Sequence, residues 1–109
     1  MRHLLLGGCH AGCLTVVGRE DALFLGKALR SRYIDQMGFI SPVYSPEDVY
    51  IRSTNIRRTI ESARLVGTGM FGGTGVALRV ETEVDAKETL YPNSVLCPRL
   101  RELFLEAAK

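Results

Sequence analysis

The feature that most constrains the fold is a short apolar run, Val49-Tyr50-Ile51, between two segments with helical periodicity. A strand without a polar face is expected where other layers cover both faces of its sheet. On either side of the run, apolar and small residues recur at the spacing of an amphipathic helix. We therefore predict an α/β layer arrangement.

The first predicted helix follows Thr15, which can act as its N-cap. The small or apolar stripe of this helix comprises Gly18, Ala22, Leu25, Gly26, Leu29 and Tyr33. Glycines on such a stripe indicate close packing against a neighbouring element. A second helix follows the strand, with Asn55, or else Ser53 or Thr54, as the expected cap. Its apolar positions are Ile56, Ile60, Ala63 and Met70.

Glycines at positions 67, 69, 72, 73 and 75 are expected to end the second helix. Residues 76–85 then alternate between apolar and polar, as in a half-buried strand. Pro98 opens a last helix with one apolar side. Because two strands alone do not make a stable sheet, we expect residues 1–109 to form a single, partial domain.

Composition excludes some classes of partner. The 109 residues are 46% hydrophobic and 24% charged, with a net charge of +2 and a mean hydropathy of +0.06. So small a charge argues against nucleic acid as a partner. No apolar run reaches the length of a transmembrane helix. We expect no targeting segment in Met1–Leu6, because its apolar stretch is too short.

Several motifs are interpreted as carrying no chemistry. CHAGC, residues 9–13, has a spacing that fits no standard zinc site, so no metal is expected. Cys9, Cys13 and Cys97 leave two states open, one disulfide with a free thiol or three free thiols. Residues 67–72 match G-x-G-x-x-G, but they follow a helix and precede a strand, so a loop is expected rather than a nucleotide site. Alternating carboxylates on the later strand are interpreted as a solvated face: Glu81, Glu83 and Asp85.

Arg52 is the candidate functional residue. It lies where open α/β sheets bind ligands, at the carboxyl end of a strand and beside a helix start. The free N–H groups and positive dipole end of the helix attract an anion. A guanidinium adds a planar fork of donors that fits phosphate. From the residues alone two interpretations stay open, a phosphate-binding arginine or a loop arginine paired with a carboxylate.

A resemblance to a known family bears on this choice. IRSTNIRRTIESA, residues 51–63, resembles the second signature of the histidine acid phosphatases, in which a strand ends in Arg-Ser-Thr followed by Asn or Asp. GCLTVVGREDALFLGKALRSRY, residues 12–33, is similar to the helix that precedes it, at the family's separation. FISPVYSPEDVYIRSTN and ETLYPN look most like the lysophosphatidic acid phosphatases of that family. The resemblance extends from about Gly7 to Arg101.

The resemblance implies a phosphoglycerate-mutase-like α/β fold and hydrolysis of a phosphate monoester, with the lysophospholipid lysophosphatidic acid as candidate substrate. It also implies a histidine nucleophile, an aspartic acid that protonates the leaving alcohol, arginines that clamp the phosphate, and no cofactor. Arg52 matches a clamp arginine and is the one catalytic and substrate-binding residue that the resemblance assigns. A mitochondrial location is suggested by the resemblance alone.

The family's Arg-His-Gly-x-Arg-x-Pro motif has no match here. Arg2-His3 is followed by Leu4-Leu5-Leu6, and His10 has no adjacent aspartic acid. We therefore expect an internal piece of such an enzyme that lacks its nucleophile and proton donor and is inactive alone. One alternative is a non-catalytic module that self-associates through unpaired strands. Another is an unrelated small α/β protein that shares the motif.

Overall fold

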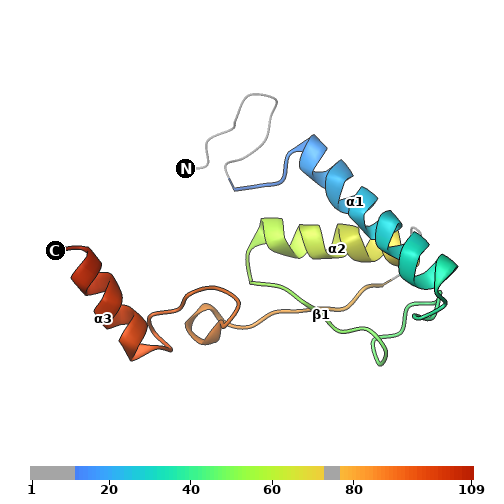
Figure 1. The fold of residues 1–109 in the computed structure, drawn as a ribbon. Helices are drawn as coiled ribbons and strands as arrows, with labels where there is room; N and C mark the ends of the chain where they lie inside the picture. The colour runs from blue at the N-terminus through green and yellow to red at the C-terminus, as the bar shows by residue number, and fades with distance from the viewer. Residues whose placement is uncertain (1–11, 73–76) are drawn as a thin grey trace.

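The computed structural model describes residues 12–72 and 77–109 (Figure 1). Its elements are α1 (Val16–Arg30), the π-helical turn η1 (Ser31–Gln36), β1 (Ile51–Arg52), α2 (Arg57–Phe71), β2 (Val80–Glu81), the 3₁₀ turn η2 (Asp85–Lys87) and α3 (Pro98–Ala107). The predicted order of helix, strand, helix, strand and helix is confirmed. The predictions for His3, Cys9 and His10 concern residues outside the described ranges.

The first helix begins where the sequence predicts. Thr15 is its N-cap, and the Thr15 Oγ1 accepts a hydrogen bond from the Gly18 N–H at 2.9 Å. Lys27 and Arg30 lie in the last turn, where positive charge complements the helix dipole. After η1 the chain turns at Gly38, whose φ of 60° suits a residue without a side chain.

The two long helices α1 and α2 lie side by side, and glycines form their contact (Figure 1). Gly26 and Gly69 are both buried there. A Cβ atom on Gly69 would lie 2.5 Å from the carbonyl oxygen of Leu23 and 2.7 Å from the amide nitrogen of Lys27. The close packing predicted for the stripe glycines is confirmed for Gly26 and wrong for Gly18, where a Cβ atom would meet, of the described residues, only Thr15 and Leu14 just before the helix.

The expectation that Gly67 and Gly69 end the second helix is wrong. Helix α2 continues to Phe71 and buries both glycines. Their missing side chains make room for neighbours, because Gly69 faces α1 while Gly67 faces Leu78 and Ile51. The G-x-G-x-x-G match is therefore mostly helical and is not the loop that the sequence predicted.

The sheet consists of two short parallel strands, with Ile51 opposite Val80 and Arg52 opposite Glu81. Helix α2 packs against it (Figure 1). Both strands are shorter than predicted, and Tyr50 lies outside the ladder with 74% of its surface exposed. Strands β1 and β2 pair with each other, and among the described residues no further strand pairs with either of them.

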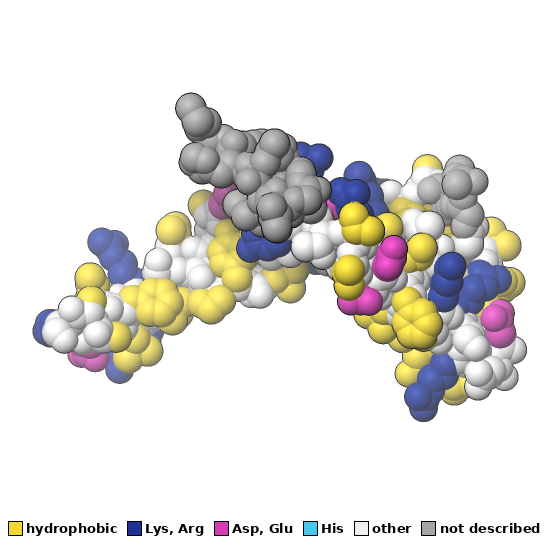
Figure 2. All heavy atoms as spheres, turned by 90° about the horizontal axis from the view of Figure 1, so that it is seen from above, with side chains coloured by type: hydrophobic (Ala, Val, Ile, Leu, Met, Phe, Trp, Pro, Cys, Tyr) yellow, Lys and Arg dark blue, Asp and Glu magenta, His cyan; other side chains and the backbone are white. Residues whose placement is uncertain are grey.

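Helix α3 begins at Pro98, as predicted, and lies at the end of an arm away from the helix pair (Figure 1). The radius of gyration is 17.6 Å, whereas a compact domain of this size has about 13 Å. Among the described residues, the buried hydrophobic ones are Ile34 and Phe71. Figure 2 shows hydrophobic side chains on the surface of both the main body and the arm. Within the same residues, no helix is long and apolar enough to cross a membrane.

Candidate functional site

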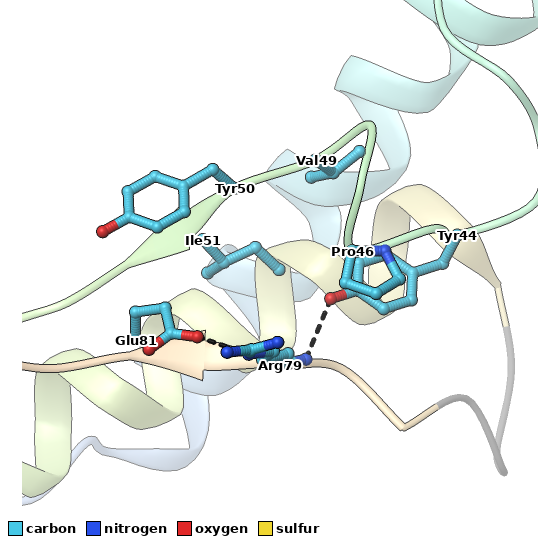
Figure 3. Close-up of a pocket in the computed structure, with 7 residues that line it drawn as sticks. All are labelled: Tyr44, Pro46, Val49, Tyr50, Ile51, Arg79 and Glu81. Carbon is cyan, nitrogen blue, oxygen red and sulfur yellow. Dashed lines mark hydrogen bonds and ion pairs between the residues drawn. The ribbon is translucent and has the colours of Figure 1, made fainter.

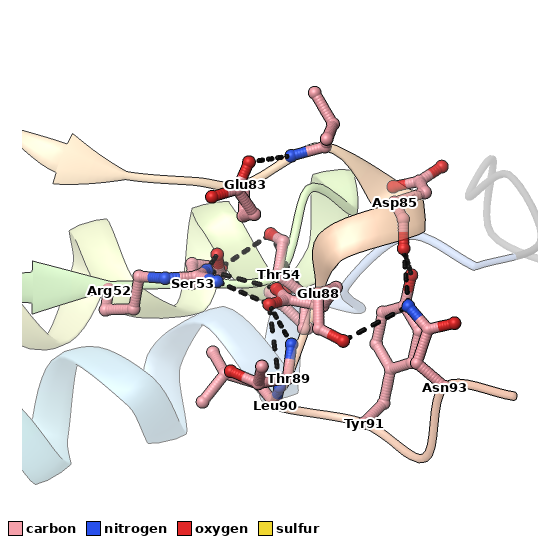
Figure 4. Close-up of polar contacts among 12 residues, drawn as sticks. Arg52, Ser53, Thr54, Glu83, Asp85, Glu88, Thr89, Leu90, Tyr91 and Asn93 are labelled. Carbon is pink, nitrogen blue, oxygen red and sulfur yellow. Dashed lines mark hydrogen bonds and ion pairs between the residues drawn. The ribbon is translucent and has the colours of Figure 1, made fainter. Parts of the chain in front are cut away.

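Arg52 is the last residue of β1, and residues 53–56 connect it to α2. The structure thus has the arginine at a strand end beside a helix start, where the sequence placed it. Figure 4 shows its side chain extending toward the segment that follows β2. That segment holds Glu88, Thr89 and Leu90.

The predicted cap of α2 is wrong. Ile56 is the N-cap residue, and no side chain caps the helix. The Ser53 hydroxyl donates to the Thr54 carbonyl at 2.9 Å, and the Thr54 and Thr59 hydroxyl oxygens lie 2.6 Å apart. These side chains therefore hold the turn before α2. The N–H groups of its first turn receive no side-chain cap and keep their capacity to attract an anion.

Glu88 is the partner of Arg52. The Nη1 of Arg52 donates to Oε1 of Glu88 at 3.0 Å, and the Nη2 donates to Oε2. The side chain of Glu88 is 1% exposed and that of Arg52 is 20% exposed. Two backbone N–H groups also reach the Glu88 Oε2, from Thr89 at 2.9 Å and from Leu90 at 3.5 Å. The carboxylate is therefore fixed from both sides.

The ion pair shifts both pKa values in the direction that favours charge. The hydrogen bond from Arg52 lowers the pKa of Glu88 below its ordinary value of 4.5, although burial acts in the opposite direction. The N–H groups of Thr89 and Leu90 lower it further. The hydrogen bond to Glu88 raises the pKa of Arg52. Both groups are consequently ionised at neutral pH.

One edge of the Arg52 guanidinium makes no hydrogen bond to a described residue. Its Nη1 donates to the Ser53 carbonyl and to Oε1 of Glu88, and its Nη2 uses one proton on Oε2 of Glu88. The Nε–H and the second Nη2–H have no acceptor among the described residues. A phosphate fits such an edge, since two of its oxygens can accept the two parallel hydrogen bonds.

A closed loop carries Glu88 (Figure 4). The Nδ2 of Asn93 donates to the carbonyl oxygens of Asp85 at 2.7 Å and of Glu88 at 3.1 Å. The Tyr91 hydroxyl donates to the Asp85 carbonyl at 3.2 Å. Burial, followed by the charges of Asp85 and Glu88, raises the pKa of Tyr91 above 10.0. The phenol therefore stays protonated and can keep donating to the loop.

The other arginines near α2 form a separate surface. Arg57, Arg58 and Arg64 are exposed, and Glu61 pairs with Arg19 of α1 at 2.5 Å. An open hollow of about 490 Å³ is lined by Arg19, Asn55, Arg57, Ile60, Glu61 and Arg64. Because Arg52 is not among these residues, the hollow does not extend the Arg52 site.

A second cleft, of about 220 Å³, lies beside the strands (Figure 3). Its lining comprises Tyr44, Pro46, Val49, Tyr50, Ile51, Arg79 and Glu81. The Tyr44 hydroxyl accepts a hydrogen bond from the backbone N–H of Arg79 at 3.0 Å, and the Arg79 side chain pairs with Glu81. Both contacts are internal to the cleft lining and link residues 44 and 81 to Arg79.

Besides Glu88, which has the largest effect, Glu83 and Tyr50 lie near enough to Arg52 to raise its pKa. Cys13 and Cys97 are free thiols. Glu83 accepts a hydrogen bond from the backbone N–H of its neighbour Val84 at 2.9 Å, and Glu81 pairs with Arg79. In residues 12–72 and 77–109, no cluster of three or more His, Cys, Asp or Glu side chains could hold a metal ion.

The sequence points to Arg52 but does not single out Glu88. The two residues are 36 positions apart, and Glu88 occurs near other carboxylates in the chain. The one available signal is its position at the head of ETLYPN, a turn-forming segment whose residues supply the N–H groups and the loop-closing amide.

Comparison with known proteins supplies independent information. Residues 2–104 match the family model of the histidine phosphatase superfamily (branch 2). The chain is similar to lysophosphatidic acid phosphatase type 6 of Mus musculus, at 42% identity over 98 residues, and of Homo sapiens, at 40% over 99 residues. Each match covers 90% of this chain and 23% of the relative. A probable acid phosphatase of Dictyostelium discoideum is 44% identical over 66 residues, which is 61% of this chain and 14% of that protein.

Proposed function

This chain belongs to branch 2 of the histidine phosphatase superfamily, and on that premise we propose that it provides part of a site that hydrolyses phosphate monoesters. The family resemblance noted in residues 51–63 is confirmed. The small parallel sheet with its packed helices agrees with part of the α/β fold of that family. The chain spans only 23% of the length of its mouse and human relatives.

One observation carries the proposal. Arg52 lies at the end of a strand, before a helix whose start has no side-chain cap, and one edge of its guanidinium bonds no described residue. In our proposal, the Nε–H and Nη2–H of this edge bind two oxygens of the phosphate. Fixed donors of this kind stabilise the charge that develops on a phosphoryl group during its transfer.

Lysophosphatidic acid is our candidate substrate, because the similar mouse and human proteins are named lysophosphatidic acid phosphatases. An apolar hollow of about 400 Å³ touches Arg52, but it does not contribute to this choice. Its lining combines consecutive residues 49–52 with one face of α2 and includes no residue of β2. The hollow therefore lies between the segment that contains β1 and helix α2.

We also propose that residues 1–109 by themselves bind phosphate without hydrolysing its esters. Hydrolysis through a phosphoryl-enzyme needs a nucleophile and a proton donor. His3 and His10 are the only histidines, and their sequence surroundings lack the family's nucleophile motif and its His-Asp pair. Arginine can hold a phosphate, but it cannot supply either of these functions.

The test is hydrolysis of p-nitrophenyl phosphate at acid pH by the purified chain, with calorimetric titration of inorganic phosphate in parallel. We expect no turnover, and phosphate binding that is lost in Arg52→Lys. Lysine preserves a positive charge beside Glu88 but removes the planar fork. Unchanged phosphate binding in this variant would contradict the clamp. Turnover that His3→Ala abolishes would instead identify His3 as a nucleophile.

The exposed apolar surface favours a second candidate function, self-association. Each described strand has one unpaired edge, and α3 exposes 52% of Phe104 and 60% of Leu105. Open strand edges and apolar patches are typical sites of association. Light scattering over a concentration series should then reveal oligomers. A monomer across the whole series would exclude this function.

A further inference from the structure

We propose that Glu88 is a positioning residue, which holds the Arg52 guanidinium in the orientation that binds phosphate. The inference rests on the phosphate-binding role proposed above for Arg52. It adds the residue that prepares Arg52 for that role before any ligand arrives. Three observations carry it: the anchoring of Glu88, the geometry of the ion pair and the donors that the pair leaves unused.

Glu88 is anchored independently of Arg52. Its Oε2 accepts the backbone N–H of Thr89 at 2.9 Å, and its own carbonyl accepts from the Asn93 side chain at 3.1 Å. Its side chain is 1% exposed, so it has little freedom to change rotamer. The closed loop therefore presents the carboxylate at a fixed position and angle, as a positioning group requires.

The ion pair also fixes the orientation of the Arg52 guanidinium. Two parallel N–H···O bonds to one carboxylate define both the location and the plane of a guanidinium. A third contact, from Nη1 to the Ser53 carbonyl, adds an anchor on the chain just after β1. An arginine otherwise loses much rotamer freedom when it binds a ligand. Here that freedom is already restricted, so less of it is lost when phosphate binds.

A different role for Glu88 would be that of a competitor, with the carboxylate occupying the place of the phosphate. The geometry opposes it. Glu88 uses the Nη1–Nη2 edge of Arg52, whereas the Nε–H and second Nη2–H have no described acceptor. A displaced Glu88 would also leave the Thr89 N–H without its partner. The two anions thus have separate edges available to them.

The two roles predict opposite effects for Glu88→Gln. If Glu88 competes or merely opposes a second anion, Coulomb's law predicts tighter phosphate binding once its charge is removed. If Glu88 positions Arg52, phosphate binding weakens. The NH₂ group of the glutamine would face an N–H donor of Arg52, and the guanidinium would turn away from its phosphate-binding orientation. The sign of the change therefore separates positioning from charge.

The first experiment titrates inorganic phosphate into the chain and follows the Nε–Hε NMR signal of Arg52. We expect about tenfold weaker binding in Glu88→Gln, the lower end of what outer-shell partners contribute at metal sites. Glu102→Gln is the control, since it removes the same charge from an exposed pair with Arg99, and it should leave binding unchanged. Equal or tighter binding in Glu88→Gln would overturn the proposal.

A second measurement needs no variant and covers the case in which Glu88→Gln does not fold. In the parent chain, the heteronuclear NOE should show a rigid Nε–Hε in Arg52 and a mobile one in Arg99, whose partner Glu102 is 63% exposed. Equal mobility would contradict the positioning role even if phosphate still shifts the Arg52 signal. A rigid Arg52 that does not respond to phosphate would refute the proposed clamp, and the positioning role with it.

Discussion

At the scale of single residues, Glu88 links the stability of the fold to pH. Its pKa is lowered in the folded chain, chiefly by the hydrogen bond from Arg52, below the ordinary value of 4.5. A carboxylate of this kind stabilises the fold above its unfolded pKa, and the stabilisation disappears as the pH falls through the folded pKa. The interaction should therefore be fully present at neutral pH and weaken in acid, below about pH 4.5.

The first prediction concerns urea unfolding of the parent and of Glu88→Gln across a pH series. We expect the variant to be less stable at pH 7, and the difference between the two unfolding free energies to shrink as the pH falls below 4.5. Glu102→Gln, on exposed α3, serves as the comparison with equal charge. A difference that does not change with pH would mean that Glu88 contributes packing and not charge.

At this scale, the sequence predicts one of the two residues of the candidate site. Arg52 follows from local rules, because a strand end and a helix start are both visible in neighbouring residues. Glu88 follows from no local rule, because the contact depends on how the chain after β2 folds back over 36 residues. Of the two interpretations that the sequence left open for Arg52, the structure shows the carboxylate partner, whereas phosphate binding stays a prediction.

At the scale of elements, the contact between α1 and α2 depends on glycine. A Cβ atom at Gly69 would meet the backbone of Leu23, Lys27 and Gly26, all within 2.8 Å. Backbone atoms cannot turn aside as a flexible side chain can, so the helices would have to separate. Gly69→Ala should therefore destabilise the fold by about 1–3 kcal/mol, the range for overpacked interiors, as measured by urea unfolding.

The matched control for this prediction is Gly18→Ala on α1. A Cβ atom there would meet only side chains, Thr15 Oγ1 at 3.2 Å and Leu14 Cδ2 at 3.7 Å. Its effect on the unfolding free energy should stay below about 1 kcal/mol, because alanine also favours the helix. Similar losses in both variants would assign the effect to the helix backbone and not to the contact between helices.

A further prediction at this scale tests the start of α1. Thr15 Oγ1 satisfies the Gly18 N–H, which otherwise has no partner within the helix. Thr15→Ala should lower the unfolding free energy by about 1 kcal/mol, whereas Thr15→Ser, which keeps the hydroxyl, should stay close to the parent. Circular dichroism during urea unfolding measures both. Equal losses in alanine and serine would show that the methyl group of Thr15, and not its cap, matters.

The two long helices also show why some element boundaries were predictable and others were not. Thr15 acts through a contact within one turn, so its role is visible in the sequence. Glycine is ambiguous, since it either interrupts a helix or permits close packing, and only the neighbouring helix decides between them at Gly67 and Gly69. Similarly, Asn55 does not cap α2, because the contacts of Thr54 and Thr59 hold the preceding turn.

At the scale of the whole molecule, apolar surface is left uncovered. Among the exposed residues are Tyr50 at 74% and Phe24 at 73%, and the radius of gyration of 17.6 Å exceeds that of a compact domain. Such surfaces are normally covered by other parts of a fold or by a partner. Because the chain spans 23% of its mouse relative, placing it in that longer fold tests what it can do there.

The last prediction therefore concerns a chimera in which this chain replaces the matching segment of the mouse lysophosphatidic acid phosphatase type 6, to which it is 42% identical. If Arg52 clamps phosphate, the chimera should hydrolyse phosphate monoesters, and Arg52→Lys should lower its kcat by roughly 10²–10³-fold, as expected for one transition-state donor. The melting temperature should change little, because lysine still neutralises Glu88. Arg99→Lys, on exposed α3, is the control and should keep full activity. A parallel loss of activity and melting temperature in Arg52→Lys would show that Arg52 supports the fold alone.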